Sequence, residues 1–95
     1  MKPLRATEAE QPEIFAILKR EMPAIHRASL KMGKQLRGLS DISQKKAISE
    51  LMASWVMAVY PEDLDLQLSL AEAIRDQAEI DLREASRVKE RQKQH

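Results

Sequence analysis

The stretch Leu51–Tyr60 constrains the fold of this chain more than any other, because nine of its ten residues are hydrophobic. It also holds two of the chain's three aromatic residues, Trp55 and Tyr60. A helix that is apolar on all sides has to be covered on several sides by other elements. We therefore expect Leu51–Tyr60 to be the central, buried helix of a small helical domain.

The rest of the chain also has the composition of a helical protein. Its 95 residues are 33% charged and 43% hydrophobic, with only two glycines and four prolines. This mixture favours long helices over sheet or disorder. We predict a small all-α bundle of three helices, or four if Pro23 breaks the first one, with a long charged C-terminal helix. The prediction is a single domain over residues 1–95, frayed at 1–6 and from about 89 to 95.

A seam of apolar residues predicts the first helix. Thr7 and Glu10 fit a capping box at its start, and Pro12 is tolerated in a first turn. Pro23 removes a helical hydrogen bond at a cost of about 3 kcal/mol, so we expect a kink or a short break near Met22. The seam alternates in steps of three and four residues, which predicts packing along most of the helix: Phe15, Leu18, Met22, Ile25, Met32, Leu36 and Leu39.

The second helix is expected between Gly38 and Pro61. Gly38 suits the C-terminal cap of the preceding helix, and Asp41 with Gln44, or alternatively Ser40, suits the start of the next. Pro61 marks its end or a turn. The main apolar stripe of this helix is Ile48, Leu51, Met52, Trp55 and Val59, widened by Val56 and Tyr60.

Residues 64–70 have two readings. Leucines alternate with polar residues there, which is the period of a strand. However, a lone strand would have no partner, and helical spacing continues afterwards. We therefore predict one long helix whose N-cap is Asp63 or Asp65. The apolar positions with helical spacing are Ala71, Ile74, Ala78, Leu82, Ala85 and Val88.

The net charge of +1 hides two blocks of opposite sign. Residues 19–46 hold eight Lys/Arg and two acids, and residues 62–84 hold eight acids and two Arg. Charge blocks of this kind bear on partners rather than on fold. The basic block forms a face opposite the apolar seam, which predicts either contact with a protein or nucleic-acid partner or an ordinary solvated surface: Arg20, Arg27, Lys31 and Lys34, extended by Arg37, Lys45 and Lys46.

The acidic block also falls on one helical face. We expect it to be a solvated face with ordinary pairs from Arg75 and Arg83 to Glu79, or else to contact a basic partner such as a second copy of the chain. No Glu-x-x-His spacing accompanies it, and the only histidines are His26 and His95, so no metal site is predicted. The residues of this acidic face are Asp65, Glu72, Asp76 and Glu79.

Neither an enzyme nor a standard DNA-reading motif is predicted. No nucleophile–base set or Gly-rich phosphate loop is present, and His26, beside the seam, is expected to be a partly buried structural residue. We therefore expect no catalytic activity and no cofactor. Gly38-Leu39-Ser40 looks like the turn of a helix-turn-helix, but Lys34 and Gln44 place polar groups at two of its core positions. A nucleic-acid contact would also lack an aromatic stacking platform.

The sequence is expected to be that of a cytoplasmic protein without a membrane contact. No apolar run follows the N-terminal Met-Lys-Pro-Leu-Arg, so no signal peptide is predicted. The longest apolar run is about half of what a bilayer span needs. The absence of cysteine suits a reducing compartment.

A few positions resemble a known family. Ile14-Phe15 with Leu18, Met22-Pro23-Ala24, and Ser54-Trp55 with Ala58 look like the helical core of phage replication proteins of the lambda P type, which load helicases. The charged helix after Leu70 departs from that family. The resemblance implies an accessory factor of a phage or plasmid.

The function that we predict from the sequence is that of a non-enzymatic adaptor or inhibitor acting by protein–protein contact. An exposed seam on a short chain favours a homodimer. The alternative is a small nucleic-acid-binding regulator that uses the basic face within residues 19–46.

Overall fold

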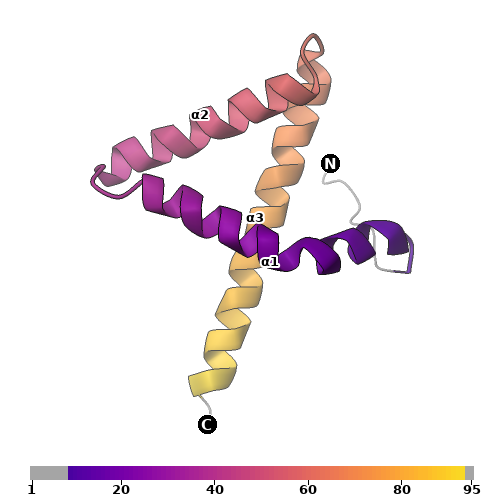
Figure 1. Ribbon diagram of the computed structural model, residues 1–95, viewed down its shortest axis with the longest axis vertical. Coiled ribbons are helices and arrows are strands. Elements are labelled where there is room, and N and C mark those ends of the chain that lie inside the picture. Colours follow the sequence, from indigo (N-terminus) through magenta and orange to yellow (C-terminus); the bar gives the residue numbers. More distant parts are fainter. Residues whose placement is uncertain (1–8, 94–95) are drawn as a thin grey trace. The chain divides into compact units, whose positions relative to one another are not determined.

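Three helices make up the fold, and no strand occurs among the residues that are described. A computed structural model describes residues 9–93 of the chain. The helices are α1 (Pro12–Gln35), α2 (Asp41–Val59) and α3 (Leu64–Lys93), in the order shown in Figure 1. The all-α class with a long charged C-terminal helix is therefore confirmed.

The chain divides into two compact units, Met1–Ala47 and Ile48–His95. Within its described residues, the first unit contains α1, the following turn and the start of α2. The second unit contains the remainder of α2 and all of α3. The single-domain assignment stays a prediction, and the two units are described separately below.

Helix α1 begins later than the sequence predicts. Pro12 occupies its first turn, as expected, but Gln11 precedes it as the N-cap and makes no side-chain capping bond. Glu10 lies in a turn before the helix, and Thr7 lies outside the described residues. The capping box is therefore not the start of this helix. Proline supplies the start instead, because its fixed backbone angle suits a first turn and its missing N–H would have no partner there.

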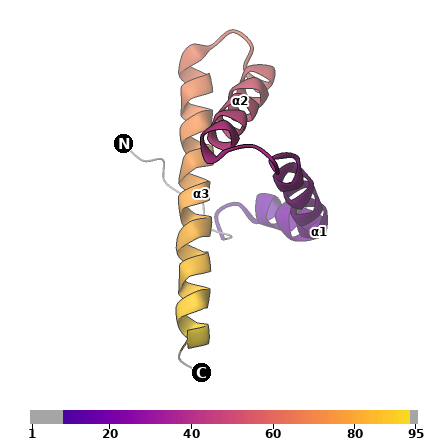
Figure 2. The same cartoon turned by 90° about the vertical axis from the view of Figure 1, so that its left-hand side faces the viewer.

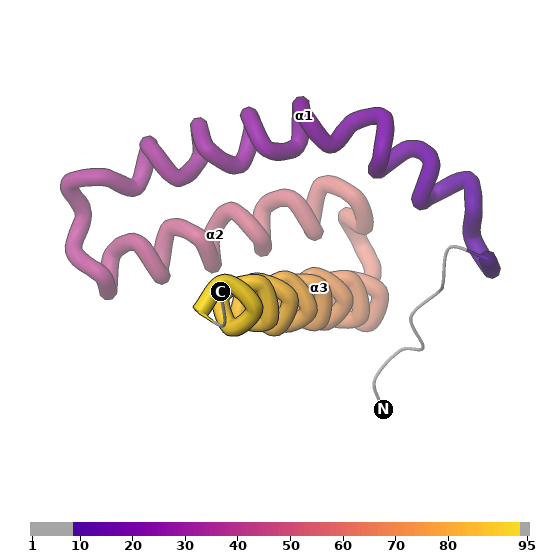
Figure 3. The backbone as a smooth tube through the Cα atoms, turned by 90° about the horizontal axis from the view of Figure 1, so that it is seen from below, coloured from indigo at the N-terminus to yellow at the C-terminus, as the bar shows by residue number. Residues whose placement is uncertain are grey.

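Pro23 does not break α1. The helix continues without interruption through this residue from Pro12 to Gln35, and Figure 3 shows its curved, unbroken coil. A proline inside a helix removes one hydrogen bond and clashes with the preceding turn, which bends a helix more readily than it ends one when both flanks are helical. Residues 9–93 therefore contain three helices rather than four.

The turn between α1 and α2 depends on Gly38 and Ser40. Gly38 has a φ angle of 91°, in the left-handed region that glycine adopts without steric cost. It lies beyond Leu36, the residue that caps the last turn of α1. Ser40 is the N-cap of α2, since its Oγ accepts a 3.3 Å hydrogen bond from the N–H of Ser43. Of the two starts that the sequence allows, the Ser40 alternative is confirmed.

Helix α3 follows a short turn that begins at Tyr60 and Pro61. The N–H of Leu66 donates a 3.1 Å bond to Oδ1 of Asp63, so Asp63 is the N-cap and residues 64–70 are helical. In the second unit, α3 reverses direction after the turn and diverges from α2 (Figure 1 and Figure 2); this pair of helices is called the helical hairpin below. Because this stretch is helical, the alternating leucines of residues 64–70 lie on several faces of α3.

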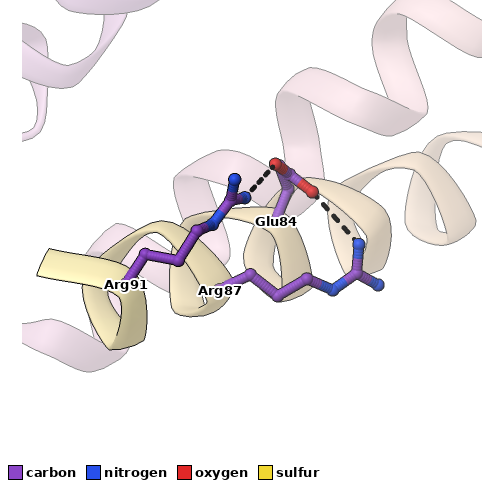
Figure 4. A network of polar contacts seen from close by, with 3 residues as sticks. All are labelled: Glu84, Arg87 and Arg91. Atoms are coloured by element: carbon purple, nitrogen blue, oxygen red, sulfur yellow. Dashed lines mark hydrogen bonds and ion pairs between the residues drawn. The ribbon is translucent and has the colours of Figure 1, made fainter. Parts of the chain in front are cut away.

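The C-terminal end of α3 remains helical where fraying was expected. The helix reaches Lys93, and fraying from about 89 to 95 stays a prediction; residues 94 and 95 lie outside the described part. Glu84 contacts Arg87 at 3.1 Å and Arg91 at 3.5 Å, as Figure 4 shows. Such pairs at helical spacing, together with cations in the last turn, compensate for the scarcity of apolar residues.

Burial corrects the interpretation of Leu51–Tyr60. Val56, with 3% of its surface exposed, is the one buried residue among those described, whereas Trp55 is 52% exposed. Met52 and Val56 belong to the face of α2 that lines a groove together with residues of α3. A hairpin covers one side of each helix, so the expectation of cover on several sides is wrong for this chain by itself.

Candidate interaction surfaces

The basic face predicted from the sequence is present on α1 and exposed to solvent. Arg20, Arg27, Lys31 and Lys34 lie on one continuous helix and all are exposed. At 1.5 Å per residue, the row from Arg20 to Lys34 spans about 21 Å. Arg37 lies in the turn after α1, and Lys45 and Lys46 lie in the first part of α2, all three exposed. The first unit therefore contains every residue assigned to the basic face.

Most of these cations have no carboxylate partner within residues 9–93. Lys46 does make a polar interaction. The ion pairs of the described chain that can be assigned to both partners lie on α3 and involve none of the basic face. The basic face thus presents uncompensated positive charge, and its residues without a partner in the described chain are Arg20, Arg27, Lys31, Lys34, Arg37 and Lys45.

The acidic face of α3 is less exposed to solvent than the sequence indicates. Asp65 is exposed, but Glu72, Asp76 and Glu79 are half-buried. Glu79 accepts two hydrogen bonds from the guanidinium of Arg83, at 2.9 and 3.3 Å, which confirms that predicted pair. The central acids are therefore partly covered, and the choice between a solvated surface and a contact with a basic partner stays a prediction.

The apolar seam of α1 is only partly covered. Phe15 and Leu36 are half-buried, whereas Leu18, Met22 and Ile25 are 42%, 39% and 38% exposed. The expectation of packing along most of the helix is therefore not met by the chain alone. His26, expected to be partly buried, is exposed.

The turn between α1 and α2 does not provide the core of a helix-turn-helix. Lys34 is exposed, as its charge requires. The side-chain amide of Gln44 donates a 2.9 Å hydrogen bond to the carbonyl oxygen of Leu39. Lys34 is therefore solvated and Gln44 stabilises the turn, whereas a helix-turn-helix would bury small or aliphatic side chains at these two positions.

An apolar groove in the helical hairpin was missed by the sequence interpretation. It has a volume of about 310 Å³ and lies between α2 and α3 in the second unit. Met57 and Leu68 line it, although neither belongs to the stripes predicted for these helices. The signal was the surplus of apolar residues beyond one helical face in Leu51–Tyr60, which we assigned to a buried core.

Neither a metal cluster nor a membrane span is found in the described residues. No group of three or more His, Asp or Glu side chains is placed to hold a metal ion within 9–93. None of the three described helices is long and apolar enough to cross a bilayer. The chemical features of residues 9–93 are thus the basic face, the acidic face and the apolar groove.

A comparison of the chain with protein families, curated proteins and solved structures finds no match. The resemblance to phage replication proteins therefore stays a prediction from the sequence. The argument for function consequently depends on the surfaces themselves.

Proposed function

We propose that this chain is a non-enzymatic adaptor or inhibitor that uses its basic face to bind an acidic protein surface. The uncompensated charge of the face supports the proposal. Arg27 and Lys31 are exposed and have no carboxylate partner in the described chain, whereas Glu84 on α3 already contacts two arginines of its own helix. A positive face attracts an acidic partner over about one Debye length and sets its orientation on docking.

A charge-reversed variant tests this proposal. Arg27→Glu/Lys31→Glu should weaken binding of a fluorescein-labelled, glutamate-rich helical peptide by about tenfold, which corresponds to about 1.4 kcal/mol. Fluorescence anisotropy at low salt provides the measurement, and circular dichroism should show unchanged helicity. The matched control is Lys89→Glu/Lys93→Glu, which makes the same change of charge at the end of α3. Equal binding by wild type and the Arg27/Lys31 variant would show that the basic face does not bind the acidic partner.

The alternative is a small nucleic-acid-binding regulator that uses the same face. The supporting observation is the row of cations along about 21 Å of one helix, since phosphate neutralisation supplies most non-specific affinity. Anisotropy with single- and double-stranded DNA at two salt concentrations tests this alternative. It predicts affinity that falls steeply with salt, and no binding at low salt would eliminate it.

We also propose that the chain forms a homodimer through the apolar seam of α1. The seam has the three-and-four spacing of a coiled-coil contact, and Leu18, Met22 and Ile25 remain about 40% exposed in one chain. Sedimentation equilibrium should give twice the chain mass, and Met22→Glu should return the protein to a monomer. Leu30→Glu, on an exposed position away from the seam, provides the control.

A further inference from the structure

The helical hairpin of the second unit has an open apolar groove that its own side chains leave unfilled. Met52, Val56 and Met57 line it from α2, and Leu64 and Leu68 line it from α3. Val56 forms the buried floor. Met57, Leu64 and Leu68 are 52%, 64% and 58% exposed, so the walls face solvent. Two methionines among these residues give the walls adaptable shape, which suits the insertion of another protein's side chains.

Acidic residues predominate in the stretch that contains every residue lining the groove, and Lys45, Lys46 and Arg75 lie just outside that stretch. Residues 47–74, which include both helices at the groove, contain no Lys or Arg. The same stretch contains five carboxylates, and its local net charge is therefore −5. An apolar groove with an acidic surround is complementary to a helix that has an apolar stripe flanked by cations. The five acids are Glu50, Glu62, Asp63, Asp65 and Glu72.

We propose that this groove binds an amphipathic helix of a partner protein, with Leu, Met or aromatic residues on one stripe and Lys or Arg on both flanks. The apolar stripe would fill the space between Met57 and Leu68. The flanking cations would then lie toward the acids of the hairpin. This mode of recognition uses side-chain anchors spaced three and four residues apart along the bound helix.

A second copy of this chain fits the groove less well than such a partner. The hairpin of a second copy would bring acidic residues against acidic residues, which is unfavourable. Helix α1 of a second copy has an apolar seam, but Arg27 and Lys31 are on its opposite face. With the seam in the groove, those cations would point away from the acids. The charge patterns of the groove and of α1 therefore favour a different protein.

This inference goes beyond the proposed function and does not depend on it. The groove belongs wholly to the second unit, and the basic face belongs to the first. With both surfaces, one chain would bind two partners of opposite charge. A variant that abolishes binding at one surface would therefore still allow binding at the other surface to be measured.

A labelled peptide pair tests the groove. The probe is a synthetic peptide of about 18 residues, or five helical turns, with leucines on one stripe and lysines on both flanks; its analogue has glutamates in place of the lysines. We expect fluorescence anisotropy to show the lysine peptide binding the full-length chain at least about tenfold more tightly than the analogue. Equal affinities would overturn the proposal.

Two variants locate the binding. Leu68→Glu should weaken binding of the lysine peptide by about tenfold or more, because it places a charge in the apolar wall. Leu82→Glu, at a 72% exposed position of α3 outside the groove, should leave binding unchanged. Circular dichroism should show both variants folded, since both side chains are exposed in the native chain. Retained binding by Leu68→Glu would overturn the assignment.

Sedimentation of the same proteins tests a second copy as the occupant. If Leu68→Glu turned a wild-type dimer into a monomer, the groove would be filled by another copy of the chain and the proposal would be wrong. We expect Leu68→Glu to leave the oligomeric state unchanged.

Discussion

The side-chain amide of Gln67 donates a 2.6 Å hydrogen bond to the main-chain carbonyl oxygen of Tyr60. Tyr60 follows the last residue of α2 and Gln67 lies in the first turns of α3, so the bond ties together the two ends of the hairpin loop. Asp63, the N-cap of α3, lies between them. The loop therefore sets the position at which α3 starts beside α2, and with it the shape of the groove.

Gln67→Ala should lower the free energy of unfolding by about 1 kcal/mol, the net value of one such hydrogen bond. Urea denaturation followed by circular dichroism provides the measurement. Gln77→Ala is the matched control, because Gln77 bonds only to Asp81 on the same exposed helix face. An equal loss for the two variants would show that the bond to Tyr60 has no special role in the hairpin.

Val56→Ala should destabilise the chain more than Trp55→Ala does, although tryptophan is the larger side chain. Val56 is buried against α3, so truncation removes two methyl groups and leaves a cavity, at about 2 kcal/mol. The exposed half of Trp55 loses little on truncation. Thermal unfolding of the two variants gives the comparison. The reverse order would indicate that Trp55 is covered in solution, for example by a second copy.

The helices could be predicted from the sequence because local signals determine them. Asp63 and Ser40 cap helices through bonds within three residues, and Pro61 follows the end of α2. Burial was not predictable in the same way. The apolar character of Leu51–Tyr60 shows that the stretch avoids water, but not whether its own chain or a partner covers it. What distinguishes Val56 from Trp55 is the position of α3, which the sequence of α2 does not contain.

The basic face was predictable for a similar reason. On one uninterrupted helix, spacing alone determines which of Arg20, Arg27 and Lys31 share a side. The half-burial of Glu72 and Asp76 was not predictable, because it depends on tertiary packing. The groove also arises from two helices that meet across a turn, so no single stretch of sequence contains it.

The same change at the two glycines should have opposite effects. Gly33 lies inside α1 with open space around it, and Gly33→Ala should stabilise the chain by about 0.5–1 kcal/mol. Gly38 has a φ of 91°, so Gly38→Ala should destabilise it by about 1–2 kcal/mol through backbone strain. Both variants can be compared by thermal melting. Stabilisation by Gly38→Ala would contradict the left-handed turn.

Glu84→Gln should loosen the C-terminal end of α3 without unfolding the chain. Glu84 contacts both Arg87 and Arg91, and each exposed pair contributes about 0.3–0.5 kcal/mol. Amide hydrogen exchange at residues 85–93 should therefore become about two- to fivefold faster at low salt. Glu90→Gln is the control, since Glu90 has one longer contact, to Lys93 at 3.8 Å. In 1 M salt, where the Debye length is about 3 Å, the difference between Glu84→Gln and wild type should largely disappear. A difference that persists unchanged in high salt would mean that packing, rather than the ion pairs, holds this end of the helix.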